Sequence, residues 1–274
     1  MLIKDLKEEI ECMFIKNIFL AFLFSIYFFS NTSAEILSHK AIYSLLIQNI
    51  KDGSFLEGGQ GQTYFEIKKG CEGWNVREDY VLIYDLPNKK TSNSLSAYST
   101  FENFAGTKHS FELNDDSQFS GKNAYEGYVE KNKSKIQGYL IKDNIKSLSF
   151  NKDLLFPVEH LRKIIQKAES GEKLYTQKVF FGNEDKEFVK TVSAFIGKKK
   201  QSTSQDFKFL SNSKVWPMKI AFYSRNSRKV DPDYEIKLDL DDKGIAHYYE
   251  VDYGDFEIKA TLKSFERVKE EKCN

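Results

Sequence analysis

Apolar and polar residues alternate with a period of two through most of the chain beyond residue 40. In the run from Glu72 to Tyr84, five large apolar or aromatic residues fall on even positions: Trp74, Val76, Tyr80, Leu82 and Tyr84. This pattern is typical of a strand with one buried face and one face in water. Because so much of the chain follows it, we predict a mainly β fold built on one large antiparallel sheet.

The alternating segments give an expected order of elements. We predict strands at 41–45, 63–68, 72–84, 101–104, 109–113, 123–128, 135–140, 177–181, 188–197, 216–223, 234–240, 245–253 and 256–262. Residues 58–61 are expected to form a flexible glycine turn, and the polar stretches 88–96 and 198–204 are expected to be loops. A turn at 241–244 would make a hairpin. Since no internal boundary is evident, residues 35–274 are predicted to form a single domain.

One segment has helical spacing instead. Its apolar residues recur every three or four positions: Leu161, Ile164, Ile165 and Ala168. Pro157 suits the first turn of a helix, and Gly171 suits the position just past its end. We therefore predict one amphipathic helix at about 157–170, packed on the sheet.

The first 34 residues resemble a cleaved signal peptide. Lys16 precedes the apolar stretch Ile18–Phe29, and small polar residues follow it up to Ala34, after which cleavage is predicted. The apolar core of about 12 residues is short of the roughly 20 that span a bilayer. An uncleaved anchor is the alternative, and Met13 is a second candidate for the true start.

Composition narrows the classes of partner. The formal net charge is +1, and charged residues of both signs are well mixed along the chain. General nucleic-acid binding needs a strongly basic surface, so we expect no nucleic-acid partner.

The three cysteines indicate an oxidising compartment. Removal of the signal would remove Cys12 and leave Cys71 and Cys273 as an even pair. In a secreted protein such a pair favours a disulfide over two free thiols. Closing a loop of about 200 residues would restrict the unfolded chain by roughly 4 to 5 kcal/mol at most. Cys71 begins the third predicted strand and Cys273 lies beyond the last, so the bridge would join one end of an open sheet to the other.

No pattern predicts a metal or cofactor site, and we expect neither. The histidines are isolated: His39, His109, His160 and His247. Four residues fall at positions 1, 3, 6 and 12 of a calcium loop, where position 6 is the turn glycine: Asp239, Asp241, Gly244 and Glu250. Lys243 occupies another ligand position and the flanks are strand-like, so a hairpin turn is favoured.

Other candidate sites also have simpler interpretations. Gly58, Gly59 and Gly61 lack the lysine and helix of a phosphate loop, and no serine lies in a Gly-x-Ser-x-Gly elbow. Three acids near the C-terminus could form an acidic site: Asp252, Asp255 and Glu257. We favour outward positions around a strand bulge at Gly254. The aromatic strand faces fit either a packed core or a curved interior that holds lipid or peptide.

Several motifs occur in the order found in one known family. They are His39-Lys40-Ala41-Ile42-Tyr43, Gly70-Cys71-Glu72-Gly73-Trp74, Phe156-Pro157-Val158-Glu159-His160-Leu161, Ala168-Glu169-Ser170-Gly171, Val215-Trp216-Pro217-Met218, Asp252-Tyr253-Gly254-Asp255-Phe256 and the terminal Cys273. The chain thereby resembles the EipB cell-envelope integrity family of Gram-negative bacteria.

The resemblance implies a periplasmic domain with a long antiparallel sheet wound into an open β-spiral, a packed helix, and a disulfide between Cys71 and Cys273. It also implies a role in envelope integrity, with a tetratricopeptide-repeat envelope protein as a partner and no catalytic residues. Our first hypothesis is therefore a non-catalytic protein that binds another protein or an envelope component, such as a lipid or a peptidoglycan-associated component. A carrier of lipid or lipoprotein on the concave sheet face is the second, and a periplasmic hydrolase is the third.

Overall fold

In the computed structural model, strands account for most of the described residues, which are 35–183, 187–203, 207, 209–224 and 230–273. The early strands are β1 (His39–Gln48), β2 (Gly58–Lys69), β3 (Gly73–Leu86), β4 (Lys90–Asn103), β5 (Lys108–Ser117), β6 (Gly121–Lys131), β7 (Lys135–Ile141) and β8 (Ile145–Asn151). The helix α2 (Pro157–Glu169) follows. The late strands are β9 (Leu174–Phe180), β10 (Val189–Ile196), β11 (Lys200–Gln201), β12 (Lys214–Ser224), β13 (Tyr234–Asp241), β14 (Ala246–Asp252) and β15 (Glu257–Arg267).

All of these strands belong to one antiparallel sheet, and its order places the two chain ends in the middle. The order is β8-β7-β6-β5-β4-β3-β2-β1-β15-β14-β13-β12-β10-β9, with β11 beside β12. The chain thus runs outward from β1 to the edge strand β8, crosses to the other edge at β9, and returns to pair β15 with β1. Leu155, just before α2, bridges Val179 of β9, so the crossing segment lines that edge.

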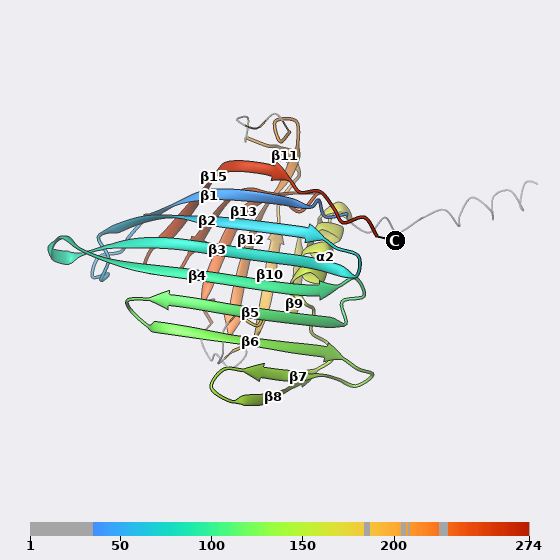
Figure 1. Ribbon diagram of the computed structural model, residues 1–274. Helices are drawn as coiled ribbons and strands as arrows, with labels where there is room; N and C mark the ends of the chain where they lie inside the picture. The colour runs from blue at the N-terminus through green and yellow to red at the C-terminus, as the bar shows by residue number, and fades with distance from the viewer. Residues whose placement is uncertain (1–34, 184–186, 204–206, 208, 225–229, 274) are drawn as a thin grey trace, which may run out of the picture. The chain divides into compact units, whose positions relative to one another are not determined.

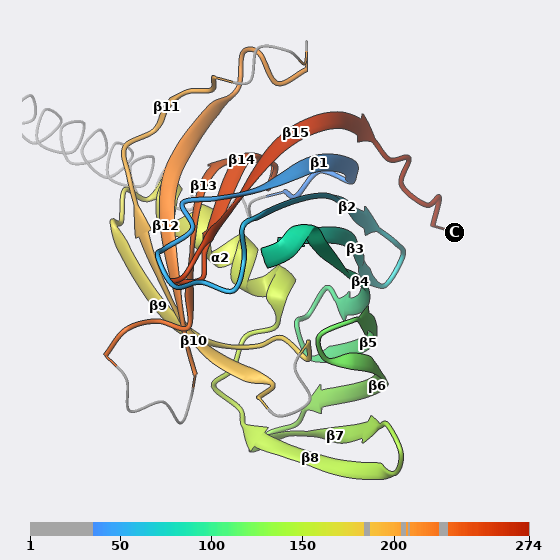
Figure 2. The same ribbon diagram turned by 90° about the vertical axis from the view of Figure 1, so that its left-hand side faces the viewer.

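The sheet curves strongly, and α2 lies within the curve between the early and the late strands (Figure 1, Figure 2). Because neighbouring strands are antiparallel, their turns fall on two margins. We call the margin with the β2–β3, β4–β5 and β13–β14 turns the helix margin. The margin with the β1–β2, β3–β4, β5–β6 and β14–β15 turns is the open margin. The predicted mainly β fold, with one large curved antiparallel sheet and a packed helix, is confirmed.

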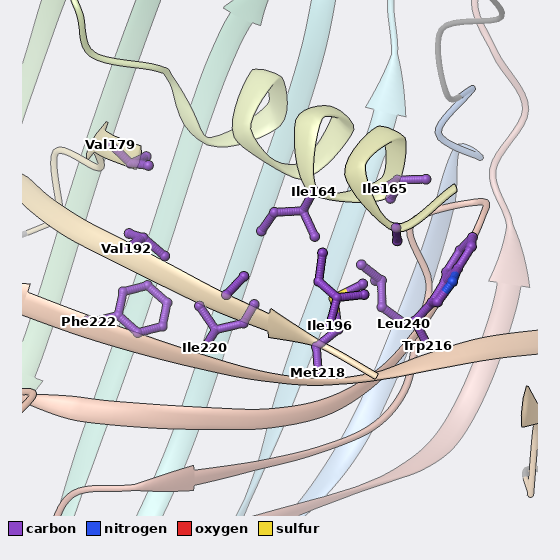
Figure 3. Close-up of a cluster of buried hydrophobic side chains, with 12 residues drawn as sticks. Ile164, Ile165, Val179, Val192, Ile196, Trp216, Met218, Ile220, Phe222 and Leu240 are labelled. Atoms are coloured by element: carbon purple, nitrogen blue, oxygen red, sulfur yellow. The ribbon is translucent and has the colours of Figure 1, made fainter. Parts of the chain in front are cut away.

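The helix ends where its sequence predicts. Pro157 occupies the first turn, and Gly171 has φ +80°, which allows its N–H and the next one to reach carbonyls of the last helical turn. Ile164 and Ile165 point into a cluster formed with β10 and β12, where Ile196 and its neighbours fill the space (Figure 3). This apolar stripe fixes the helix against the late strands.

Two local predictions were wrong. Most of the expected loop 88–96 is the first half of β4, which pairs with β3 after a tight turn with positive φ at Asn88 and Lys89. The glycines at 58–61 belong to β2, where a Cβ on Gly61 would lie 2.0 Å from the Val81 carbonyl oxygen. Close approach of two strands therefore explains this glycine better than turn flexibility.

Residues 1–34, and with them the predicted signal and its cleavage after Ala34, lie outside the described residues. Within the described part of the chain, no helix has both the length and the apolar character needed to cross a membrane.

Candidate functional site

A disulfide joins Cys71 and Cys273 at the helix margin, with their Cα atoms 5.4 Å apart. Cys71 lies in the β2–β3 turn and Cys273 in the tail after β15. The tail is also held by Lys68, whose ammonium lies 3.0 Å from the Glu271 carboxylate, and by a hydrogen bond from the Ser38 hydroxyl to Glu270. Such a bridge closes a long loop in the unfolded chain and so disfavours unfolding.

The position of the bridge differs from the expectation that it joins the two ends of the sheet. Those ends are β8 and β9, whereas Cys71 and Cys273 adjoin β2, β3 and β15, and β2 and β15 flank β1 near the middle of the sheet. The sequence suggested a link between the sheet ends because the two cysteines lie near the first and last strands of the chain. In the sheet, however, these strands are neighbours in the middle. The bridge therefore fastens the central strands where the chain begins and ends.

Ser202, His247 and Asp241 form a hydrogen-bonded trio beside the β13–β14 hairpin. The Ser202 hydroxyl lies 2.6 Å from His247 Nδ1, and His247 Nε2 lies 3.0 Å from Asp241 Oδ2. Asp241 Oδ1 accepts hydrogen bonds from the backbone N–H groups of Lys243 and Ile245, each at 2.9 Å. These residue types are those of a hydrolase triad. Sequence reasoning did not bring them together because Ser202 comes from a segment distant from the hairpin that carries Asp241 and His247.

The trio is sealed from solvent. Ser202 and His247 are each 3% exposed and Asp241 is 2% exposed. None of them lines the cavity described below. A nucleophile must reach a substrate carbonyl, and this serine is enclosed. The trio therefore anchors the segment after β11 to the hairpin as a satisfied polar network.

The candidate calcium and acidic sites are not assembled. Asp239 pairs with Lys200 at 3.0 Å, and Glu250 accepts a hydrogen bond from Gln48, so neither joins Asp241. Among the described residues, no cluster of His, Cys, Asp and Glu could hold a metal ion.

The interpretation of Gly254 as a strand bulge was wrong. This residue lies in the β14–β15 turn with φ +87°, where its N–H donates to Asp252 Oδ1. Glu257 of the same acidic stretch faces elsewhere and accepts a hydrogen bond from Asn49 at 2.6 Å. The Asp-Tyr-Gly-Asp-Phe motif thus makes a tight turn on the open margin.

The remaining histidines lie at the helix margin or on α2 and are buried. The ring of His109 stacks 5.1 Å from Phe156, and burial lowers its pKa to about 3. His160 of α2 stacks on Tyr175, and burial lowers its pKa to about 4. Burial also lowers the pKa of His39. These neutral rings act as core residues.

Glu102 of β4 supplies the N-cap that the sequence of α2 lacks. Its two carboxylate oxygens accept hydrogen bonds from the backbone N–H groups of Val158 and Glu159, each at 2.8 Å. Phe156, at the N-cap position, contributes no side-chain bond. Burial raises the pKa of Glu102 to about 7, although the two N–H groups act in the opposite direction. The helix is therefore docked electrostatically as well as by apolar packing.

A cavity of about 490 Å³ lies toward the open margin. Its early wall comes from β2 to β5 and carries the polar lining groups Thr63, Glu78, Ser96 and Asp115 together with Tyr80 and Tyr98. Its late wall comes from β13 to β15 and is formed by aromatic and aliphatic side chains, including Ile236, Tyr249, Val251 and Ile258. This volume is within the usual range for small-molecule sites, roughly 300 to 1,000 Å³.

Glu78 is the unusual residue of this cavity. It shares the inner face of β3 with Leu82, and its cross-strand neighbours are Phe65 and Tyr98. The side chain is exposed to the cavity space, yet the surrounding protein desolvates the carboxyl and raises its pKa, with a further contribution from Asp79. No hydrogen bond or ion pair joins it to another described residue. Its carboxylate thus faces the open interior without a partner.

Asp115 is the second carboxyl of the cavity. It accepts a hydrogen bond from the Ser96 hydroxyl, and burial raises the pKa of this carboxyl. Along β4, Ser96 continues a buried inner row with Ser92 and Ser94. The early wall thus offers acceptors and hydroxyl groups where most strand faces of this fold are apolar.

The comparisons with known proteins agree with this architecture. The EipB-like family profile matches residues 30–269. The chain belongs to the EipB-like family. A relative from Brucella abortus (strain 2308), named cell envelope integrity protein EipB, is 26% identical over 238 residues, which cover 84% of each chain.

A crystal structure from Brucella abortus, described as a beta-barrel-like protein of domain of unknown function DUF1849, has a similar fold. Its TM-score is 0.79 at 24% identity, over 86% of this chain and 99% of that one. The resemblance to the EipB-like family stated from the motifs is confirmed.

Aromatic side chains surround the open margin of this EipB-like chain. Phe55 and Phe119 are 58% and 50% exposed and meet edge to face at 5.8 Å. Phe119 also contacts Tyr84, which lines the cavity. Tyr253 of the β14–β15 turn is 46% exposed and lines the cavity from the other side. Exposed rings of the open margin therefore line the cavity or contact its lining.

The sequence did carry one signal for this EipB-like site. Position 78 falls on the even register of β3, between Val76 and Tyr80, so a charged residue occupies the apolar face. A carboxylate there has either a buried partner or an open space in front of it. The alternating serines of β4 carry the same information, but their polarity suggested a loop.

Proposed function

We propose that this chain is a non-catalytic periplasmic protein that supports the integrity of the cell envelope by binding an envelope component in the cavity at the open margin. Family membership and the name of the Brucella relative support the envelope role. The disulfide supports an oxidising location, either periplasmic or secreted. The observation that carries the binding role is the cavity itself, with its exposed aromatic approach.

Deletion and complementation test this function. Cells without the protein should become more sensitive to detergents and to cell-wall antibiotics, and the wild-type chain should restore resistance. Val251→Trp fills the cavity from the late wall, so it should fail to restore resistance. Val81→Trp is the matched control because Val81 is 44% exposed on the outer face of β3, and it should restore resistance fully. Rescue by both variants would contradict the role of the cavity.

A carrier of lipid or lipoprotein is the second candidate, and the late wall favours it. Its side chains are apolar or aromatic, which suits an acyl chain. Native mass spectrometry of gently purified protein should show a bound lipid that is lost in Val251→Trp. A mass that corresponds to the protein alone would contradict the carrier role and leave the envelope role to be judged by complementation.

The partner that the family resemblance implies is a tetratricopeptide-repeat envelope protein. Tagged chain recovered from periplasmic extract should bring this partner with it, whereas a tagged unrelated periplasmic protein should not. Recovery without any repeat protein would argue against the association.

A further inference from the structure

Among the described lining residues, the cavity carries negative charge and no positive charge. Glu78 and Asp115 are the ionisable acids among its lining residues, and no Lys, Arg or His belongs to the described lining. Carboxylates buried elsewhere in the chain are compensated: Glu102 by two backbone N–H groups, and Asp241 by two N–H groups and His247. Glu78 instead faces the cavity and has no hydrogen-bond or ion-pair partner among the described residues.

The tyrosine rings of the cavity also favour a cationic ligand over an anionic one. Tyr80, Tyr98 and Tyr249 line the same cavity as Glu78. The faces of aromatic rings attract cations, most strongly where water is excluded. Carboxylates in a tyrosine-rich cavity therefore suit an ammonium group better than an anion.

The late wall defines the rest of the ligand. Ile236, Val251 and Ile258 offer apolar surface opposite the acids, and this wall contributes no charged side chain to the lining. A ligand that fits both walls needs a cationic group on one side and an apolar body on the other. The volume of about 490 Å³ suits a single chain or a small ring system.

We propose that the cavity takes an amphiphilic organic cation, in which an ammonium group pairs with Glu78 and Asp115 and an apolar chain lies against the late wall. The inference rests on the proposed function, since it names the class of component that the cavity binds. It excludes free fatty acids and other anionic amphiphiles as preferred ligands, because their head would face uncompensated carboxylates.

Three probes of equal chain length test the head group. Decylamine, decanol and decanoate are titrated into the purified, disulfide-bonded protein below their micellar concentrations, with binding followed by calorimetry. Decylammonium is expected to bind at least about tenfold more tightly than decanoate, the difference expected of a charge-assisted pair. Glu78→Gln should weaken decylammonium binding about tenfold and should not weaken decanol binding.

Asp85→Asn is the matched control, because Asp85 is an exposed acid on the same strand with its side chain off the cavity lining. It should leave all three affinities unchanged, and thermal unfolding of each variant reports whether it is folded. Equal binding of all probes, or insensitivity to Glu78→Gln, would overturn the cationic preference while the cavity remains a binding site. Binding of none of them would overturn both the inference and the role of the cavity in the proposed function.

Discussion

At the helix margin, carboxylates are matched by backbone N–H groups, whereas at the open margin Glu78 and several aromatic rings face space. Glu102 caps α2 and Asp241 closes the β13–β14 hairpin, and the disulfide adds a covalent link beside them. The polar groups of the helix margin thus stabilise the fold, whereas those of the open margin remain available to a ligand. The difference shows that a period-two pattern specifies the sheet. A few residues on its inner face then determine whether the interior is packed or open to a ligand.

Removing the disulfide of the helix margin should lower the unfolding free energy more than any other change considered below. The double variant Cys71→Ser and Cys273→Ser is expected to lose up to about 4 kcal/mol of unfolding free energy, since the unfolded chain regains the freedom of a long loop. Urea titration followed by circular dichroism measures the loss. Wild-type protein in reductant should match the variant, and an unchanged urea midpoint would show that the tail contacts suffice.

Truncation of one isoleucine on the helix and one in the cavity lining compares how tightly the two regions are packed. Ile165 of α2 is 0% exposed, so Ile165→Ala should cost about 3 kcal/mol, as enclosed large-to-small changes do. Ile236 is half-buried against the cavity, and Ile236→Ala should cost roughly 1 kcal/mol because the removed methyl groups already border open space. Equal losses in urea titrations would mean that the cavity side is packed as firmly as the helix side.

Acid should weaken the helix margin first. The pKa of His109 is about 3 in the fold against an ordinary value of 6.5, so below pH 6.5 the unfolded chain takes up a proton that the fold refuses. Stability is therefore lost as pH falls from 6.5 toward 3, by about 2 kcal/mol at pH 5 for this residue. His109→Phe should remove that part of the loss in urea titrations at pH 7 and pH 5.

Glu102 acts in the opposite direction and provides the control. Its pKa of about 7 lies above the ordinary 4.5, so its protonation favours the fold as pH falls between these values. Glu102→Gln should therefore make the acid loss steeper, where His109→Phe makes it shallower. Identical pH dependence in both variants would contradict the assignment of these groups.

The smallest effect is expected at the open margin. Glu78→Gln removes a desolvated charge without breaking a hydrogen bond to a described residue, so the unfolding free energy should rise slightly, by less than about 0.5 kcal/mol. Thermal unfolding measures it. A loss of several kcal/mol would show that Glu78 supports the fold and would weaken its assignment to ligand binding.

Much of the fold could be predicted from sequence because its signals are local. Alternation located most strands, and Pro157 and Gly171 bounded α2 closely. The first half of β4 was missed because its inner face is serine rather than aliphatic, and β8 was missed altogether. The serines of β4 gave no apolar period to recognise, whereas the short β8 offers only two alternating apolar residues, Leu148 and Phe150.

The site was harder to predict because it depends on distant segments. The cavity brings together strands from both halves of the chain, and no single segment contains its two walls. The Ser202, His247 and Asp241 trio is likewise formed by tertiary contact. What sequence did offer was the single charge at position 78 in an apolar register.

The pairing of β1 with β15 has a consequence for how the chain acquires its structure. The first strand of the sheet needs the last one as its neighbour, since His39 lies opposite Arg267. A chain that is synthesised N-terminus first exposes one edge of β1 until the final strand is available. Pairings of such long sequence separation make folding slow, and an unpaired edge invites association with other chains. The sheet is therefore complete only when β15 has paired with β1.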